Sequence, residues 1–150
     1  MMKAAIQVAL EGMRSGKGGP FGAVVVKDGK IVGKGCNMVT STNDSTAHAE
    51  VTAIRDACKN LGTFQLDGCE IYTSCEPCPM CLGAIYWARP SKIYFACTKQ
   101  DAANIGFDDA FIYEEIEKPY AERAIKTIQV LQEEAISIFQ EWASKGDKIE

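Results

Sequence analysis

Apolar residues recur near the start of the chain at the spacing of a helix. Over residues 2–14 they return every three to four positions, with charged or amide side chains between them. This period predicts an amphipathic helix with one face against a core. The recurring apolar residues are Ala5, Val8, Ala9 and Met13. A glycine-rich run that ends at Pro20 predicts the end of this helix before residue 20.

A β-hairpin is predicted directly after the first helix. Residues 21–26 and 30–35 are two short runs with the composition of strands, and Asp28-Gly29 lies between them. Asp-Gly between two such runs is the strongest local signal for a tight hairpin turn. Residues 37–44 are polar and predict a loop.

Helical and strand-like patterns then alternate. A helix is predicted over residues 45–60, with Asp44 or Ser45 as its cap and Leu61-Gly62 as its end. A strand at 70–74 precedes a second helix, which Pro77 begins as its first residue and which runs to about residue 88. A further strand follows at 92–97. This α/β alternation predicts parallel neighbouring strands with right-handed crossovers, and ligand sites at the helix N-termini.

The last third of the chain has a weaker pattern. Residues 100–123 predict a loop with a broken helix, residues 127–131 a fifth strand, and residues 133–144 a terminal helix. The apolar residues of that helix, Ile136, Phe139 and Trp142, need a surface to cover them.

Composition indicates one soluble domain over residues 1–150. The chain is 47% hydrophobic and 24% charged, which is ordinary for a globular protein, and its length suffices for a core without disulfides. Lys3, Glu11 and Arg14 interrupt the apolar positions of the N-terminal segment, so we expect no signal peptide, and no apolar run is long enough for a membrane span. Seven cysteines, an odd number, fit a reducing, cytoplasmic location.

The net charge of −4 bears on the partner. Proteins that bind nucleic acid carry a basic surface, because phosphate neutralisation supplies most of the non-specific affinity. Lys27, Lys30 and Lys34 lie close together, but on the predicted hairpin they are best interpreted as a solvated face. The charge therefore favours a small-molecule substrate and no nucleic acid.

Two short motifs carry the candidate chemistry. His48-Ala49-Glu50 contains the chain's only histidine, and Pro77-Cys78-Pro79-Met80-Cys81 follows further along. One imidazole and two thiolates provide three ligands for a tetrahedral zinc ion and leave the fourth position to water, as in catalytic sites, whereas a structural zinc site usually has a fourth protein ligand. A C-x-x-C pair alone would be weak, because redox pairs and zinc knuckles share it. H-x-E followed by P-C-x-x-C is typical of zinc nucleobase and nucleoside deaminases.

The motifs also suggest a role for each member. We predict one zinc ion per chain, held by His48, Cys78 and Cys81, with Glu50 free to transfer protons. Cys78 and Cys81 fall at a predicted helix start, where the helix dipole favours thiolates. For the other cysteines we expect small buried side chains. These are Cys36, Cys58, Cys69, Cys75 and Cys97.

Almost the whole chain resembles the cytidine-deaminase-like superfamily and, within it, the small bacterial guanine deaminases. The segments that carry the resemblance are Gly19-Pro20-Phe21-Gly22-Ala23-Val24, Asn37, residues 46–55, residues 73–89 and Gly106-Phe107-Asp108-Asp109. The resemblance implies a three-layer α/β/α sandwich with a mixed five-stranded sheet. It also implies zinc-dependent hydrolysis of guanine to xanthine and ammonia, in a homodimer whose C-terminal segments are swapped.

The resemblance and side-chain chemistry together suggest four residues that bind the base. Asn37 could pair with a purine edge or hold its loop through an Asx-turn, and Asp109 could accept hydrogen bonds from the base or cap a helix. Phe21 could pack on the base or in the core. Trp87 could line the pocket, contact another subunit or pack in the helical core.

Three other functions share part of this pattern. A tRNA adenosine deaminase has the same ligand pattern, but the acidic balance argues against it. A cytosine or cytidine deaminase comes third, and a zinc-stabilised binding module is the non-enzymatic alternative. This chain ends in Lys148-Ile149-Glu150, where the guanine deaminases it resembles end in a tyrosine that reaches the substrate pocket.

Overall fold

The computed structural model describes residues 1–146. The chain end, with Lys148-Ile149-Glu150, lies outside the described residues. The chain divides into two compact units, Met1–Ile112 and Tyr113–Glu150, which are described separately. The single-domain organisation of residues 1–150 stays a prediction.

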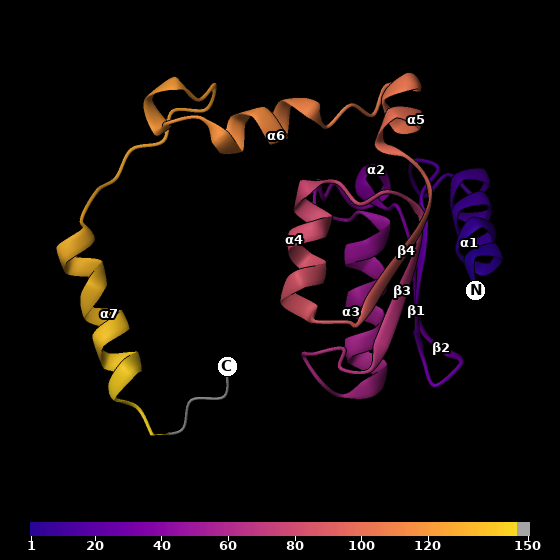
Figure 1. Cartoon of the computed structure of the whole chain (residues 1–150), viewed down its shortest axis with the longest axis horizontal. Coiled ribbons are helices and arrows are strands. Elements are labelled where there is room, and N and C mark those ends of the chain that lie inside the picture. The colour runs from indigo at the N-terminus through magenta and orange to yellow at the C-terminus, as the bar shows by residue number, and fades with distance from the viewer. Residues whose placement is uncertain (147–150) are drawn as a thin grey trace. The chain divides into compact units, whose positions relative to one another are not determined.

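The first unit is a three-layer α/β/α sandwich (Figure 1). Helix α1 (Met2–Arg14) covers one face of the sheet, and α3 (Ala49–Leu61) and α4 (Pro79–Ala88) cover the other. Two short helices complete the unit, α2 (Val39–Thr42) and α5 (Lys99–Asn104). The predicted α/β class and layer arrangement are therefore confirmed.

The sheet is mixed, as predicted, but it has four strands. Its order is β2-β1-β3-β4, in which β1 pairs antiparallel with both β2 and β3, and β3 pairs parallel with β4. The strands span Gly22–Lys27 (β1), Lys30–Cys36 (β2), Cys69–Cys75 (β3) and Lys92–Cys97 (β4). The parallel pair joins the two strands that flank α4, as the α/β alternation predicts.

The predicted fifth strand at residues 127–131 is wrong for this structure. The segment is not a strand, although its residues are strand-like in composition. A strand requires a neighbour for its backbone N–H and C=O groups. Because none of the described strands pairs with this segment, the sheet described here ends at β4.

Two helix starts differ from the sequence prediction. Helix α3 begins at Ala49, with His48 as its cap residue, rather than at Asp44 or Ser45. Asp44 instead accepts hydrogen bonds from the backbone N–H and hydroxyl of Thr46, which close a turn before the helix. Helix α4 has Pro79, not Pro77, at its first position, because Cys78 is its cap residue.

Small residues bring α3 close to the sheet. A Cβ atom added at Gly33 would lie 2.6 Å from the Cβ of Ala57, and one at Gly35 would clash with the backbone of Ala49 and Ala53. Ala49, Ala53 and Ala57 are fully buried in the main core cluster. Contacts this close fix the position of α3, and hence of the residues at its N-terminus.

The cysteines outside the motifs follow the expected pattern only in part. Cys36, Cys69 and Cys75 are buried and Cys58 is half-buried, whereas Cys97 is exposed. The expectation of burial is wrong for Cys97 because it lies on β4, the last strand of the sheet, whose side chains are largely exposed.

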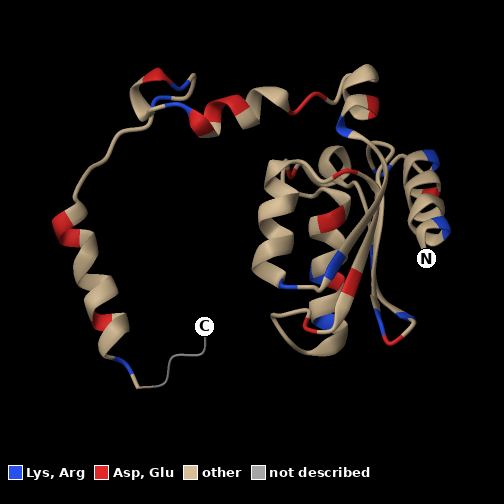
Figure 2. Cartoon of the chain, in the orientation of Figure 1, with Lys and Arg blue, Asp and Glu red and all other residues tan. Residues whose placement is uncertain are grey.

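The charged residues of the described chain are interspersed in sign (Figure 2). Lys30 and Lys34 on the hairpin are exposed and Lys27 is half-buried, as expected for a solvated face. Among residues 1–146, no helix has the length and apolarity needed to cross a membrane.

The second unit contains the 3-10 helix η1 (Tyr120–Glu122) and α7 (Gln132–Ser144), and α6 (Ala110–Glu117) leads into it. Arg123 organises the turn after α6: its guanidinium donates to the carbonyls of Glu115 and Ile116 at 3.0 and 3.2 Å. The Glu115 carboxylate accepts from the backbone N–H of Ala124 at 3.0 Å. Residues 125–131 connect this turn to α7.

Candidate active site

The N-termini of α3 and α4 carry the two sequence motifs. His48 and Cys78 are the cap residues of these helices, and neither side chain makes a capping hydrogen bond. A serine or aspartate at a cap position would normally accept from the first-turn N–H groups. Here the imidazole and the thiol are left for another function, and both helix dipoles favour negative charge at this point.

The three predicted zinc ligands converge. Nδ1 of His48 lies 3.5 Å from Sγ of Cys78 and 3.3 Å from Sγ of Cys81, and the three ligand atoms all lie within 4.8 Å of one another. A tetrahedral site with Zn–N of about 2.1 Å and Zn–S of about 2.3 Å has ligand–ligand edges of about 3.6 Å. The donor set and its spacing therefore fit a zinc ion, and Nδ1 is the imidazole atom that faces the sulfurs.

The three side chains also interact through hydrogen bonds. A bond from the Cys81 thiol, assisted by His48, lowers the pKa of Cys78 to about 4. The same bond and burial raise the pKa of Cys81. The interaction with Cys78 raises the pKa of His48 above its usual 6.5, against the effect of burial. The cluster thus resembles an ion pair, and metal binding must release its protons.

Glu50 lies in the first turn of α3, beside the cluster, and is only 7% exposed. Burial raises the pKa of this carboxyl group, while a hydrogen bond from its own backbone N–H opposes the shift. A bound cation would also act in the opposite direction. A buried carboxyl group beside the ligand cluster is placed to transfer protons.

A cavity of about 570 Å³ adjoins the cluster. His48, Glu50 and Cys78 line it, together with three of the four residues predicted to bind the base, Phe21, Asn37 and Asp109. The described structure therefore gathers residues from five separate stretches of the sequence around one space.

The side chain of Asn37 already uses its oxygen in two hydrogen bonds. Its carboxamide oxygen accepts from the backbone N–H groups of Gly19 at 3.3 Å and Val39 at 3.1 Å. The bond to Val39 is the Asx-turn expected as one alternative. Since the oxygen is used twice, the two N–H donors of the amide are the part of this side chain that suits a ligand.

Asp109 is half-buried, and burial raises the pKa of its carboxyl group. The side chain that accepts from the first N–H of α6 belongs to Asp108, not to Asp109. The hydrogen bonds therefore give no support to the helix-capping alternative for Asp109.

The aromatic wall includes one residue that the sequence analysis did not single out. Phe21 meets Phe107 edge to face, with ring centroids 5.0 Å apart, and both line the cavity. Phe107 lies within the run Gly106-Phe107-Asp108-Asp109, so the signal was present. Glu76, which lies within the run 73–89, and Lys99, which no motif marked, also line the cavity.

Trp87 does not line this cavity. Its side chain is 78% exposed on α4, so the alternative of packing in the helical core is wrong. Tyr86 beside it is 72% exposed, and α4 is apolar on nearly all sides. A helix of this kind normally has a partner on its outer face.

Comparison with known proteins identifies the class. Residues 1–97 match the family model described as "Cytidine and deoxycytidylate deaminase zinc-binding region". The chain therefore belongs to this family of zinc-dependent deaminases, hydrolases that act on C–N bonds. The family and the His48, Cys78 and Cys81 cluster are together compatible with one zinc ion per chain.

Relatives within the family are similar over nearly the whole length. The chain is 60% identical to guanine deaminase from Bacillus subtilis (strain 168) over 99% of this chain and 96% of that protein. An X-ray structure of Bacillus subtilis guanine deaminase superposes with a TM-score of 0.96, covering 99% of this chain and 95% of that one. A tRNA-specific adenosine deaminase from Aquifex aeolicus (strain VF5) is 33% identical over 96% of this chain and 92% of that protein.

Proposed function

We propose that this chain is a guanine deaminase, which converts guanine and water to xanthine and ammonia. The observation that carries the proposal is the whole-length similarity to guanine deaminase, 60% identical over 99% of the chain. The cavity supports it, because it combines a zinc-compatible cluster, a buried carboxyl group and polar groups suited to a purine.

His48 Nδ1, Cys78 Sγ and Cys81 Sγ hold the metal in this proposal. When bound, a zinc ion supplies Lewis-acid chemistry and lowers the pKa of a coordinated water to about 7. Glu50 takes a proton from the attacking water. It gives this proton to the purine ring nitrogen. It then takes the remaining proton of the hydroxyl added at C2 and gives it to the exocyclic amine, which leaves as ammonia as the C2 carbonyl forms.

The base is held by groups on the opposite side of the cavity. The amide N–H donors of Asn37 face acceptors on the purine edge, and Asp109 accepts from the base's N–H groups. Phe21, supported by Phe107, packs on the ring. Trp87 lies outside this cavity and therefore does not contact a base bound in it.

The substrate proposal predicts a preference and a salt response. Zinc-loaded protein should release ammonia from guanine much faster than from adenine or cytosine. Because guanine has no phosphates to neutralise, the rate should change less than about twofold between 50 and 200 mM salt. Ammonia release across bases and nucleosides measures both. Rapid deamination of a tRNA anticodon stem-loop, falling steeply with salt, would instead favour a tRNA adenosine deaminase.

A homodimer with exchanged C-terminal segments is the second part of the proposal. Residues 125–131 expose large apolar side chains, with Ile125 at 83% and Ile128 at 76%. Strand β4 pairs on one side only within the described sheet. An apolar hollow of about 400 Å³, lined by residues of α1, β4 and α5, lies beside it. Residues 125–131 of a second copy would pair with β4 as an added strand. The α7 helix of that copy would cover the hollow.

Charge placed on the proposed strand should break this dimer. Ile128 and Val130 fall on one face of such a strand, and Gln129 on the other. The double substitution Ile128→Lys, Val130→Lys would bury two unpaired ammonium groups and should weaken the dimer at least about 100-fold. The matched control Gln129→Lys should stay dimeric. Light scattering during size-exclusion chromatography distinguishes them, and a monomeric wild-type protein would exclude the dimer.

A cytoplasmic location completes the proposal. All seven cysteines are free thiols in the structure, although Cys75 and Cys97 lie opposite each other in register. Free thiols in this number suit a reducing compartment.

A further inference from the structure

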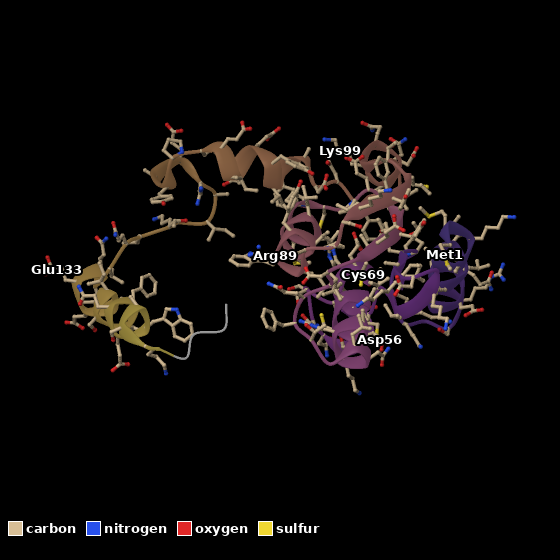
Figure 3. The ribbon with its side chains drawn as sticks, turned by 60° about the horizontal axis from the view of Figure 1, so that its bottom comes forward. Met1, Asp56, Cys69, Arg89, Lys99 and Glu133 are labelled. Carbon is tan, nitrogen blue, oxygen red and sulfur yellow. The ribbon has the colours of Figure 1, made fainter. Side chains whose placement is uncertain are left out.

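Glu76 connects two parts of the cavity that are far apart in the sequence. It follows β3 directly, and its backbone N–H donates to the carbonyl of Cys97 at 2.8 Å. Its side-chain Oε1 accepts from the backbone N–H of Lys99 at 3.1 Å. One residue thus attaches the loop before α4 to the junction between β4 and α5. Figure 3 labels Lys99 in this region.

The side-chain bond completes the start of α5. The cap residue Thr98 and Asp101 bond each other's backbone N–H groups in a capping box. Lys99 is the first residue of the helix, and its N–H group is outside that box. The Glu76 carboxylate supplies an acceptor for it from a different element of the fold.

The two connected segments carry opposite sides of the candidate active site. On one side, Cys78 lies two residues after Glu76 and begins α4. On the other, α5 leads into the residues that place Phe107 and Asp109 on the cavity wall. The carboxylate of Glu76 is half-buried and lines the same cavity. Its bond to Lys99 therefore links the metal-holding side of the cavity to the base-holding side.

We propose that Glu76 is a positioning residue, whose hydrogen bond to Lys99 holds the base-binding wall in register with the metal-binding helix start. The inference rests on the proposed function for its substrate. Glu76 contacts neither the three ligand atoms nor Glu50 in the described hydrogen bonds, so it acts through the segments that it joins. Loss of the bond should impair substrate binding more than the chemical step.

Kinetics of two substitutions test this role. Glu76→Ala removes the acceptor and should raise the KM for guanine about tenfold, the size expected for one charge-assisted hydrogen bond, while kcat changes less than threefold. Glu76→Gln keeps an acceptor oxygen at the same distance and should restore KM to within about threefold of wild type. Zinc content should stay at one per chain in both. A wild-type KM in Glu76→Ala, or a Gln variant as impaired as the Ala variant, would overturn the proposal.

Thr98→Ala is the matched control. It removes the helix's own cap but keeps the bond from Glu76, so KM should change less than about threefold. An increase equal to that of Glu76→Ala would mean that Glu76 merely stabilises α5, and the positioning role would be wrong.

Hydrogen exchange provides a readout that needs no substrate. In zinc-loaded protein, residues 98–109 should exchange about tenfold faster in Glu76→Ala than in wild type, and Glu76→Gln should match wild type. Equal exchange in all three would overturn the proposal. If these differences appear while wild-type protein does not deaminate guanine, the structural coupling stands and the proposed substrate fails.

Discussion

Replacing Glu50 with glutamine should reduce guanine turnover at least about 10²-fold, as expected when a general acid–base group is lost. Glutamine has the same shape, so the first turn of α3 and its contact with the cluster can be retained. It cannot carry a proton between water and the base. Because Glu50 is only 7% exposed, a neutral amide also removes a buried charge, and the free energy of unfolding should not fall appreciably.

The measurement is kcat for guanine in protein with a determined zinc content. Glu11→Gln is a matched control, since Glu11 is exposed on α1 and its side chain bonds the exposed Gln7. It should behave as wild type. Near-normal turnover by zinc-replete Glu50→Gln would remove Glu50 from the mechanism.

Removal of zinc should abolish deamination, and one equivalent per chain should restore it. His48, Cys78 and Cys81 converge at the spacing of three zinc ligands, and the reaction needs the Lewis acid that they would hold. Chelation followed by stepwise addition of zinc, with activity and metal content measured together, tests this directly. Full activity in metal-free protein would contradict the account.

The affinity for zinc should also fall as the pH falls. Protons compete with the metal for the imidazole and thiolates. The interaction with Cys78 raises the pKa of His48, and the bond to Cys78 and burial raise the pKa of Cys81, so both ligands hold protons that the metal must displace. Titration calorimetry in buffers of different ionisation enthalpy should show proton release on binding. No release would mean that the ligands are already deprotonated.

Local patterns were sufficient for most of the first unit. Helix α1 has the predicted bounds, Met2–Arg14, because its period and its glycine-rich end are both local signals. The Asp28-Gly29 hairpin lies where predicted, with both glycine and Asp28 in the left-handed region.

The sequence predictions of secondary structure were wrong where a hydrogen bond to another segment or side chain decides the local structure. His48 rather than Asp44 is the cap residue of α3, because the Asp44 carboxylate accepts a hydrogen bond from the backbone N–H of Thr46 in the turn before the helix. Residues 127–131 have strand composition, but composition cannot supply the neighbouring strand that hydrogen bonding needs.

The sequence predicted the proposed zinc ligands and Glu50, but it predicted fewer of the residues that line the cavity. His48, Glu50, Cys78 and Cys81 form motifs with fixed spacing, and the structure brings them together. Phe107, Glu76 and Lys99 join the cavity through contacts between segments distant in sequence, which periodicity does not reveal. The role of Trp87 depends on what covers the exposed face of α4, which the sequence pattern of that helix does not reveal.

The most direct test of the central claim is the fate of guanine itself. Zinc-loaded protein should be incubated with guanine in water enriched in ¹⁸O, and the products analysed by mass spectrometry. Hydrolysis at C2 predicts xanthine carrying one solvent oxygen, with one ammonia released per xanthine and only background product from Glu50→Gln. Unchanged guanine under conditions in which the same preparation deaminates another base or a tRNA would contradict the proposed function.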